Sequence, residues 1–319
     1  MHNSFTKILP FALFIGFLFC SCASDNYYGR HIKDVDYYNT CNPPGGVKIA
    51  DNFYYDESEV TNINYLEFLF WTKRVYGDSS IEYKSALPDT LVWRDTAYLH
   101  RITSPGIKYL LENNYLKGVK FENYPLVGIT QEQAKTCTKW RSDRVMEFIL
   151  VANNEIKWDP NPTKDSCFTI ERYYSGQYKN ITPKDRFSYY PDFRLPTVDE
   201  WRKAVRYDDS LAAIKPNIKV TASWIDISPC KVDTEFYVPT EKVTGTVNPK
   251  KGSPIYNLLD NVSEWTADSG VCVGGSWHDK KEIVLNVLKQ DTFHRTKPNA
   301  WTGFRNVCQW KKWDGSVLH

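Results

Sequence analysis

Three segments of this 319-residue chain have a helical pattern of apolar residues, and long stretches rich in Pro, Asn and Tyr separate them. These segments are residues 59–75, 128–150 and 195–207. A run of β-branched and aromatic residues at 47–55 favours a strand. Because so long a chain shows so few regular elements and no internal repeat, we predict a single α+β domain that is poor in regular secondary structure.

The starts of the three helices carry capping signals. Thr61 precedes the first apolar face, and Thr130 is followed by Gln133 at the spacing of a capping box. Pro196 and Thr197 stand at the start of the third segment. We therefore expect helices to begin just after these residues.

Aromatic residues make up 15% of the chain, with 11 Trp and 21 Tyr. Large rigid side chains bury much area and can stabilise loop-rich structure. Tyrosines in the loops either anchor a protein partner or line the core, and we favour the core for most of them. The tyrosines in question are Tyr173, Tyr174, Tyr178, Tyr189 and Tyr190.

The amino terminus resembles a bacterial lipoprotein signal. Lys7 precedes an apolar run at 8–19, which is followed by Cys20, Ser21 and Cys22. The run is shorter than the roughly 20 residues of a membrane-spanning helix and fits a cleaved signal peptide. We predict a signal peptide at 1–21 and lipidation of Cys22; ordinary secretion with cleavage near Ala23 is the alternative.

The next residues are polar and aromatic without a period, and they close on Pro-Pro-Gly-Gly. They predict a tether at 22–46, followed by a domain at 47–313 and a tail at 314–319. The chain has 40 Lys and Arg against 38 Asp and Glu, so its charge gives no argument for nucleic-acid binding. Six cysteines beyond Cys22 permit disulfides in an oxidising compartment, and their wide spacing argues against structural zinc.

Six blocks occur in the order found in the formylglycine-generating (sulfatase-modifying) enzyme superfamily, which the chain therefore resembles. They read FYYDESEVTNINYLEFL, YPLVGITQEQAKTCTKWRSDR, FRLPTVDEWRKAVR, NLLDNVSEWT, GGSW and GFRNV. The resemblance covers about residues 47–310 and implies a variant of the C-type-lectin-like fold. A narrower likeness, in LPDTLVWRDTAYL at 87–99 and in the leader, is to gliding-motility lipoproteins of the K and J type. Those lipoproteins serve the type IX secretion machinery.

Catalytic members of the superfamily bind copper with two cysteine thiolates that follow the GGS motif. Counted from Ser276, those positions are Asp279 and Val284 here, and neither side chain replaces a soft thiolate ligand of Cu(I). No cysteine lies between Cys272 and Cys308. The Trp that helps to form the oxygen pocket of the family is Ser263 in this chain. We therefore expect no copper or iron.

The resemblance also implies a calcium site beside the NLLDNVSEWT block. Asn257 and Glu264 fall at its side-chain ligand positions, and Asp260 and Val262 fall where backbone carbonyls are used. These oxygen donors suit Ca²⁺. The alternative is that Asn257 and Glu264 only satisfy amide groups of the loop.

Histidines near the GGSW block give a weaker functional signal. His278, Asp279, His294 and Arg295 invite an acid–base or metal interpretation, but their spacing does not require one. The ergothioneine-type relatives also need an iron site in a separate helical domain, and we expect no such domain here.

Together the leader, the ordered blocks and the missing thiolates predict a non-catalytic lipoprotein of the cell envelope. We expect it to be anchored by lipid to a membrane, in the first place the outer membrane, and to act as a scaffold for protein partners in type IX secretion or gliding. A metal-dependent oxidoreductase and a glycan- or peptidoglycan-binding module are the alternatives.

Overall fold

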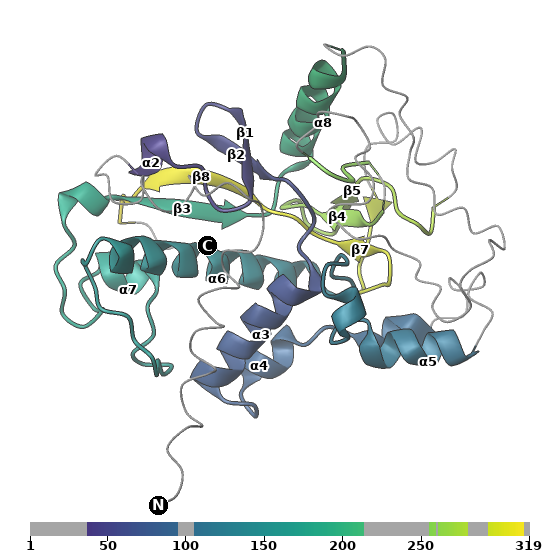
Figure 1. Cartoon of the computed structure of the whole chain (residues 1–319), viewed down its shortest axis with the longest axis horizontal. Coiled ribbons are helices and arrows are strands. Elements are labelled where there is room, and N and C mark those ends of the chain that lie inside the picture. The colour runs from purple at the N-terminus through teal and green to yellow at the C-terminus, as the bar shows by residue number, and fades with distance from the viewer. Residues whose placement is uncertain (1–36, 95–104, 214–254, 260, 280–292, 316–319) are drawn as a thin grey trace, which may run out of the picture.

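The computed structural model describes residues 37–94, 105–213, 255–259, 261–279 and 293–315. Two short four-stranded sheets lie side by side along the molecule (Figure 1). Sheet A has the order β1-β2-β8-β3 and is antiparallel throughout. Sheet B has the order β6-β5-β4-β7, in which β4 and β7 are parallel.

The strands of sheet A are β1 (Gly46–Ala50), β2 (Phe53–Asp56), β3 (Tyr189–Arg194) and β8 (Val307–Lys312). The strands of sheet B are β4 (Ser263–Trp265), β5 (Val271–Val273), β6 (Phe293–His294) and β7 (Thr302–Gly303). The α-helices are α2 (Tyr37–Thr40), α3 (Asn62–Tyr76), α4 (Ile81–Ala86), α5 (Pro105–Asn114), α6 (Gln131–Ala152), α7 (Ile170–Tyr174) and α8 (Val198–Ala213). Three 3₁₀ turns are η1 (Thr90–Arg94), η2 (Val119–Phe121) and η3 (Asp185–Phe187).

The three predicted helices are present as α3, α6 and α8, and their caps are the predicted ones. The Thr61 hydroxyl accepts a hydrogen bond from the Asn64 amide, and the Thr130 hydroxyl accepts one from Gln133. The Gln133 side chain accepts from the Thr130 amide at 2.8 Å, which completes a capping box. Thr197 and Glu200 exchange the same two bonds at the start of α8.

The predicted strand at 47–55 is wrong as a single strand, because it is a hairpin of β1 and β2. Asn52 has φ of 47°, a left-handed conformation that Asn tolerates better than most residues. Its side chain exchanges two 2.9 Å hydrogen bonds with the backbone of Trp310 in β8. The chain therefore reverses at this residue, and the turn is joined to the centre of sheet A. Helices α4 and α5 were not predicted from the sequence.

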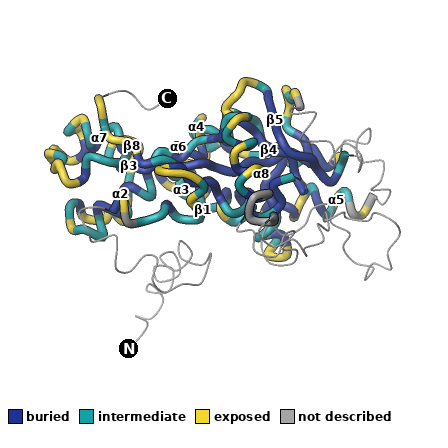
Figure 2. Tube along the Cα trace, turned by 90° about the horizontal axis from the view of Figure 1, so that it is seen from above, coloured by how far each residue is buried: buried dark blue, intermediate teal, exposed yellow. Residues whose placement is uncertain are grey.

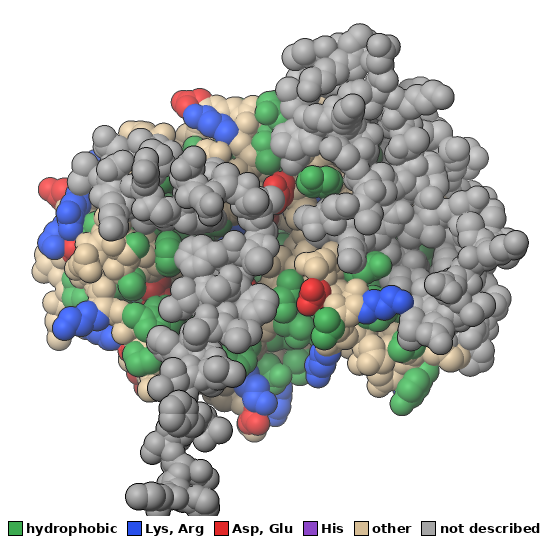
Figure 3. Space-filling view, viewed as in Figure 1, with side chains coloured by type: hydrophobic (Ala, Val, Ile, Leu, Met, Phe, Trp, Pro, Cys, Tyr) green, Lys and Arg blue, Asp and Glu red, His purple; other side chains and the backbone are tan. Residues whose placement is uncertain are grey.

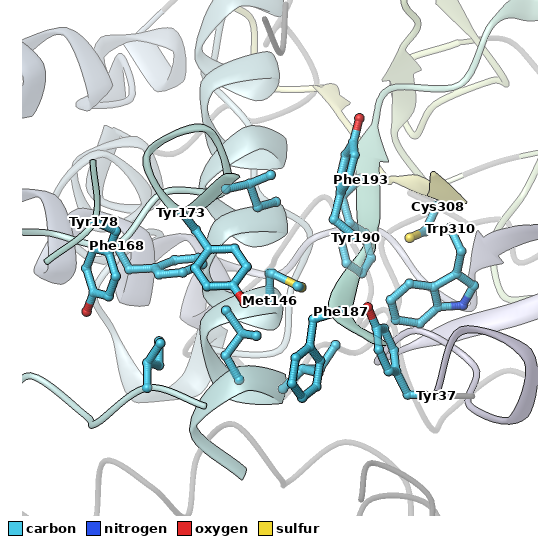
Figure 4. Close-up of a cluster of buried hydrophobic side chains, with 14 of the residues drawn as sticks. Tyr37, Met146, Phe168, Tyr173, Tyr178, Phe187, Tyr190, Phe193, Cys308 and Trp310 are labelled. Carbon is cyan, nitrogen blue, oxygen red and sulfur yellow. The ribbon is translucent and has the colours of Figure 1, made fainter. Parts of the chain in front are cut away.

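The long helix α6 packs against β3 (Figure 1). Buried residues lie along this contact (Figure 2). Around it lies an aromatic cluster in which Tyr173, Tyr178 and Tyr190 are buried (Figure 4). Tyr174 and Tyr189 are partly buried against the same cluster. The preference for a core role of these tyrosines is therefore confirmed, and they hold loops together where regular structure is scarce.

Residues from Tyr37 onward, which the sequence analysis assigned to a tether at 22–46, contact the rest of the domain. Tyr37 is fully buried, and its ring stacks with Phe187 and meets Trp310 edge to face (Figure 4). Its hydroxyl donates to the carbonyl of Tyr189, and the Trp310 indole donates to the carbonyl of Cys41. Residues from Tyr37 onward thus belong to the domain, because aromatic side chains at this point fill its core. Residues 22–36 of the predicted tether lie outside the described residues.

On the face shown in Figure 3, the described Lys and Arg side chains are interspersed with acidic and apolar ones. No helix within the described residues has the length and apolar character needed to cross a bilayer.

Glu67 on α3 offers a test of packing between α3 and α6. Burial alone raises its pKa to about 7, from 4.5. Between pH 4.5 and 7 the folded protein therefore binds more protons than the unfolded chain, so this residue lowers stability progressively as pH rises. Glu67→Gln should raise the free energy of unfolding by about 1–3 kcal/mol at pH 8 and change it little at pH 4.5.

Urea unfolding at both pH values measures this effect. The exposed Glu132 supplies a matched control, since Glu132→Gln should show no comparable gain at pH 8. Equal effects of Glu67→Gln at the two pH values would contradict the burial of an ionised carboxylate.

Candidate functional site

The loop that leads into β4 is shaped by two asparagines in left-handed conformation. Asn257 has φ of 50° and Asn261 has φ of 65°, and both side chains are buried. Asn adopts this conformation more readily than other residues with a side chain, apart from Asp and His. The loop therefore turns at both ends of the NLLDN sequence, and the side chains of these two asparagines lie in the interior.

Five buried side chains meet there, and we call them the Arg305 cluster. Its members are Glu59, Asn257, Asn261, Glu264 and Arg305. Arg305 Nε donates to Glu264 Oε1 at 2.6 Å, and Arg305 Nη2 lies 3.5 Å from Glu59 Oε2. The guanidinium also donates to the carbonyls of Asp56 and Tyr256 at 3.3 and 2.8 Å. Four partners therefore hold the guanidinium of Arg305 in position.

The asparagine amides complete the cluster by donating to Glu59. Asn261 Nδ2 lies 3.0 Å from Glu59 Oε1, and Asn257 Nδ2 lies 3.4 Å from Glu59 Oε2. Two segments far apart in sequence, the NLLDN loop and the GFRNV block, thus converge on the carboxylate of Glu59, which lies two residues before the α3 cap Thr61.

The charges of the cluster do not balance, since two carboxylates face one guanidinium. Burial raises the pKa of Glu59 to about 8 and that of Glu264 to about 7, against the opposing effect of Arg305. Among the described residues, Glu264 Oε2 has no hydrogen-bond partner, and neither does the buried hydroxyl of Tyr55 nearby. A buried acceptor without a donor is costly, so the cluster favours a proton or a cation beside Glu264.

Three of the four residues predicted for the calcium site lie within the described part of the chain. Asn257, Val262 and Glu264 are all buried around this loop, and Asp260 lies outside the described residues. Among the described residues, the partnerless carboxylate oxygen of Glu264, the amide oxygen of Asn257 and the carbonyl of Val262 are donors of the kind that a hard cation takes. Asn257 and Glu264 would hold such an ion through their side chains.

The positions of the lost copper ligands show no soft ligand. Asp279 accepts a 2.6 Å hydrogen bond from the Ser276 hydroxyl, and Val284 lies outside the described residues. Ser263, at the position of the oxygen-pocket Trp, is fully buried and donates to the carbonyl of Trp301. Within the described ranges, no three His, Cys, Asp or Glu side chains form a group able to hold a metal.

The nearest thiols do not form a pair. Cys272 lies in β5 of sheet B and Cys308 lies in β8 of sheet A, and each is buried in a different hydrophobic cluster. Burial raises the pKa of Cys272 to about 12, and burial also raises the pKa of Cys308 well above its usual value. Both are free thiols, as are Cys137 and Cys167. Protonated, separated thiols are poor ligands and poor nucleophiles.

Of the histidines that the structure describes, one packs on an aromatic ring and one lies at the surface. His278 stacks on Trp301 with ring centroids 4.2 Å apart, and His294 is exposed on β6. The backbone amide of Arg295 donates to the carbonyl of Gly270. Burial raises the pKa of Cys272, and the charge of Arg295 lowers it to a smaller extent.

Sequence reasoning missed Glu59, Asn261 and Arg305 as members of the site. Each belongs to one of the six blocks that carry the resemblance, in EVTN, NLLDN and GFRNV respectively. The signal available in the sequence was a charged residue within a motif whose other residues are typical of a protein interior. Nothing in the spacing of the blocks indicates that they meet in the fold.

A family model described as the sulfatase-modifying factor enzyme 1-like domain matches residues 24–310. Among solved structures, the chain is similar to the one titled "Crystal Structure of CarF", at 18% identity and a TM-score of 0.39. That match covers 81% of this chain and 86% of the other. No curated protein matches the chain. The fold is thus of the α+β formylglycine-generating-enzyme-like type, as predicted from the sequence.

Proposed function

Because the chain belongs to the sulfatase-modifying factor enzyme 1-like family, we propose that it is a non-catalytic member that serves as a scaffold in the cell envelope. The observation that carries this proposal is the absence of a thiol pair at Asp279 and Val284, together with the burial of Cys272 and Cys308 in different sheets. The oxidation chemistry of the family depends on two thiolates that bind a soft metal ion.

The leader supports a membrane-anchored form, with Cys22 as the lipidated residue and the outer membrane as the site of attachment. The likeness of 87–99 and of the leader to gliding-motility lipoproteins favours partners in type IX secretion or gliding. A structural Ca²⁺ held by Asn257 and Glu264 belongs to this proposal, because Glu264 Oε2 is buried without a donor among the described residues.

The test is affinity purification of the tagged full-length protein from membranes, beside the variant Cys22→Ser. The wild type should co-purify with components of a secretion or gliding complex, and Cys22→Ser should leave the membrane fraction and lose them. Partners recovered equally with Cys22→Ser in the soluble fraction would contradict the anchor. Recovery of no envelope protein with the wild type would contradict the scaffold.

An oxidoreductase with a rearranged metal centre is the rival function, and metal analysis of the same purified protein separates the two. Stoichiometric copper or iron with oxygen uptake on a thiol peptide would favour the enzyme. Retention on peptidoglycan or polysaccharide would instead favour a binding module.

A further inference from the structure

We propose that Glu59 and Arg305 orient the ligands of the calcium site without binding the ion themselves. This inference rests on the proposed calcium site and extends it to two residues outside the NLLDNVSEWT block. Groups that hydrogen-bond to metal ligands fix their orientation and strengthen binding, and losing such a group lowers metal affinity by about 10–100-fold.

Glu59 determines which way the asparagine amides point. A carboxylate accepts hydrogen bonds and repels a carbonyl oxygen, so the amide nitrogens of Asn257 and Asn261 must face Glu59, as they do at 3.4 and 3.0 Å. The Oδ1 atom of Asn257 is then directed away from Glu59. One buried carboxylate thus presents the amide oxygen of Asn257 as a ligand.

Arg305 acts in the same way on Glu264. Its Nε atom donates to Oε1 at 2.6 Å, which leaves Oε2 as the oxygen without a donor among the described residues. Hydrogen bonds to the carbonyls of Asp56 and Tyr256 hold the guanidinium in place and prevent it from covering both oxygens of Glu264. The carboxylate is therefore turned with one oxygen bound and one available.

The charges of the cluster agree with this division of roles. Arg305 lies 2.6 Å from Glu264 Oε1 and 3.5 Å from Glu59 Oε2, so one guanidinium faces two carboxylates. With both carboxylates ionised the cluster carries one net negative charge, and the oxygen without a donor is on Glu264. A cation at Glu264 Oε2 would complete the balance, and Glu59 would keep Arg305 from competing with that cation.

The experiment measures binding of Ca²⁺ by calorimetry and of Tb³⁺ by tryptophan-sensitised luminescence, with the full-length protein. The variant is Glu59→Gln, which keeps the shape of the side chain and removes the carboxylate. Its matched control is Glu147→Gln, since Glu147 on α6 is also buried and paired with an arginine, Arg144, at 3.0 Å. Circular dichroism establishes that each variant is folded, and Glu59→Asp replaces Glu59→Gln if the latter does not fold.

The wild type and Glu147→Gln should bind one ion with equal affinity, and Glu59→Gln should bind it about 10–100-fold more weakly. Wild-type affinity in Glu59→Gln would overturn the orienting role and leave the calcium site standing. No binding by the wild type would overturn the calcium site itself, and the orienting role with it.

Discussion

Arg305→Leu should lower the free energy of unfolding by about 3–5 kcal/mol, the largest effect expected from any single substitution of a charged residue in this chain. The substitution leaves Glu59 and Glu264 facing each other in a site where both are buried. It also removes the donors to two backbone carbonyls and to Glu264 Oε1. Urea unfolding at pH 8 in a calcium chelator measures the loss.

The pH dependence separates this electrostatic origin from a simple loss of packing. With Arg305 present, the pKa values of Glu59 and Glu264 are already raised to about 8 and 7. Without it both rise further, so the folded state binds more protons than the unfolded chain and is stabilised as pH falls. The deficit of Arg305→Leu should therefore shrink between pH 8 and pH 5.

The control for this prediction is Arg94→Leu, which removes a bidentate pair with Glu112 at the surface. Exposed ion pairs contribute little, so this variant should unfold close to the wild type. A deficit of Arg305→Leu that is the same at pH 5 and pH 8 would refute the electrostatic account.

Tyr37→Ala should destabilise the domain by about 3–5 kcal/mol, as expected for removal of a large buried aromatic side chain. Tyr37 fills a space between Phe187 and Trp310 and donates its hydroxyl to Tyr189. Burial also raises the pKa of this phenol, which keeps it protonated as a donor. Thermal and urea unfolding of the full-length variant measure the effect.

Asn39 on the same short helix is exposed and provides the control. Asn39→Ala should leave the free energy of unfolding within the range of ordinary surface substitutions. If Tyr37→Ala were equally harmless, α2 would be part of a loosely attached tether and the boundary predicted at residue 46 would be the better one.

Local signals explain which parts of this fold could be predicted from sequence. The starts of α3, α6 and α8 depend on contacts within four residues, and Thr61, Thr130 and Thr197 identify them correctly. The hairpin at Asn52 was missed because its turn is stabilised by Trp310, which is 258 residues away. A run of strand-forming residues does not reveal such a partner.

The candidate site likewise has features that the sequence predicts and features that it does not. The missing thiolates are a local fact of the sequence, and so is the oxygen-rich NLLDN loop. Glu59 follows β2, Glu264 lies in β4 and Arg305 lies between β7 and β8. Their meeting therefore depends on how sheets A and B are placed in the fold, which no spacing in the chain encodes. Long-range ionic contacts of this kind become visible only in three dimensions.

The docking of α2 also sets how a lipidated form would stand on a bilayer. Cys22 precedes Tyr37 by 15 positions, and a fully extended stretch of that length spans at most about 50 Å. In Figures 1 and 2, α2 lies toward one end of the long axis and sheet B toward the other. If Cys22 is lipidated, as proposed, the point of membrane attachment would therefore lie within that distance of the α2 end, and sheet B would lie at the other end of the domain.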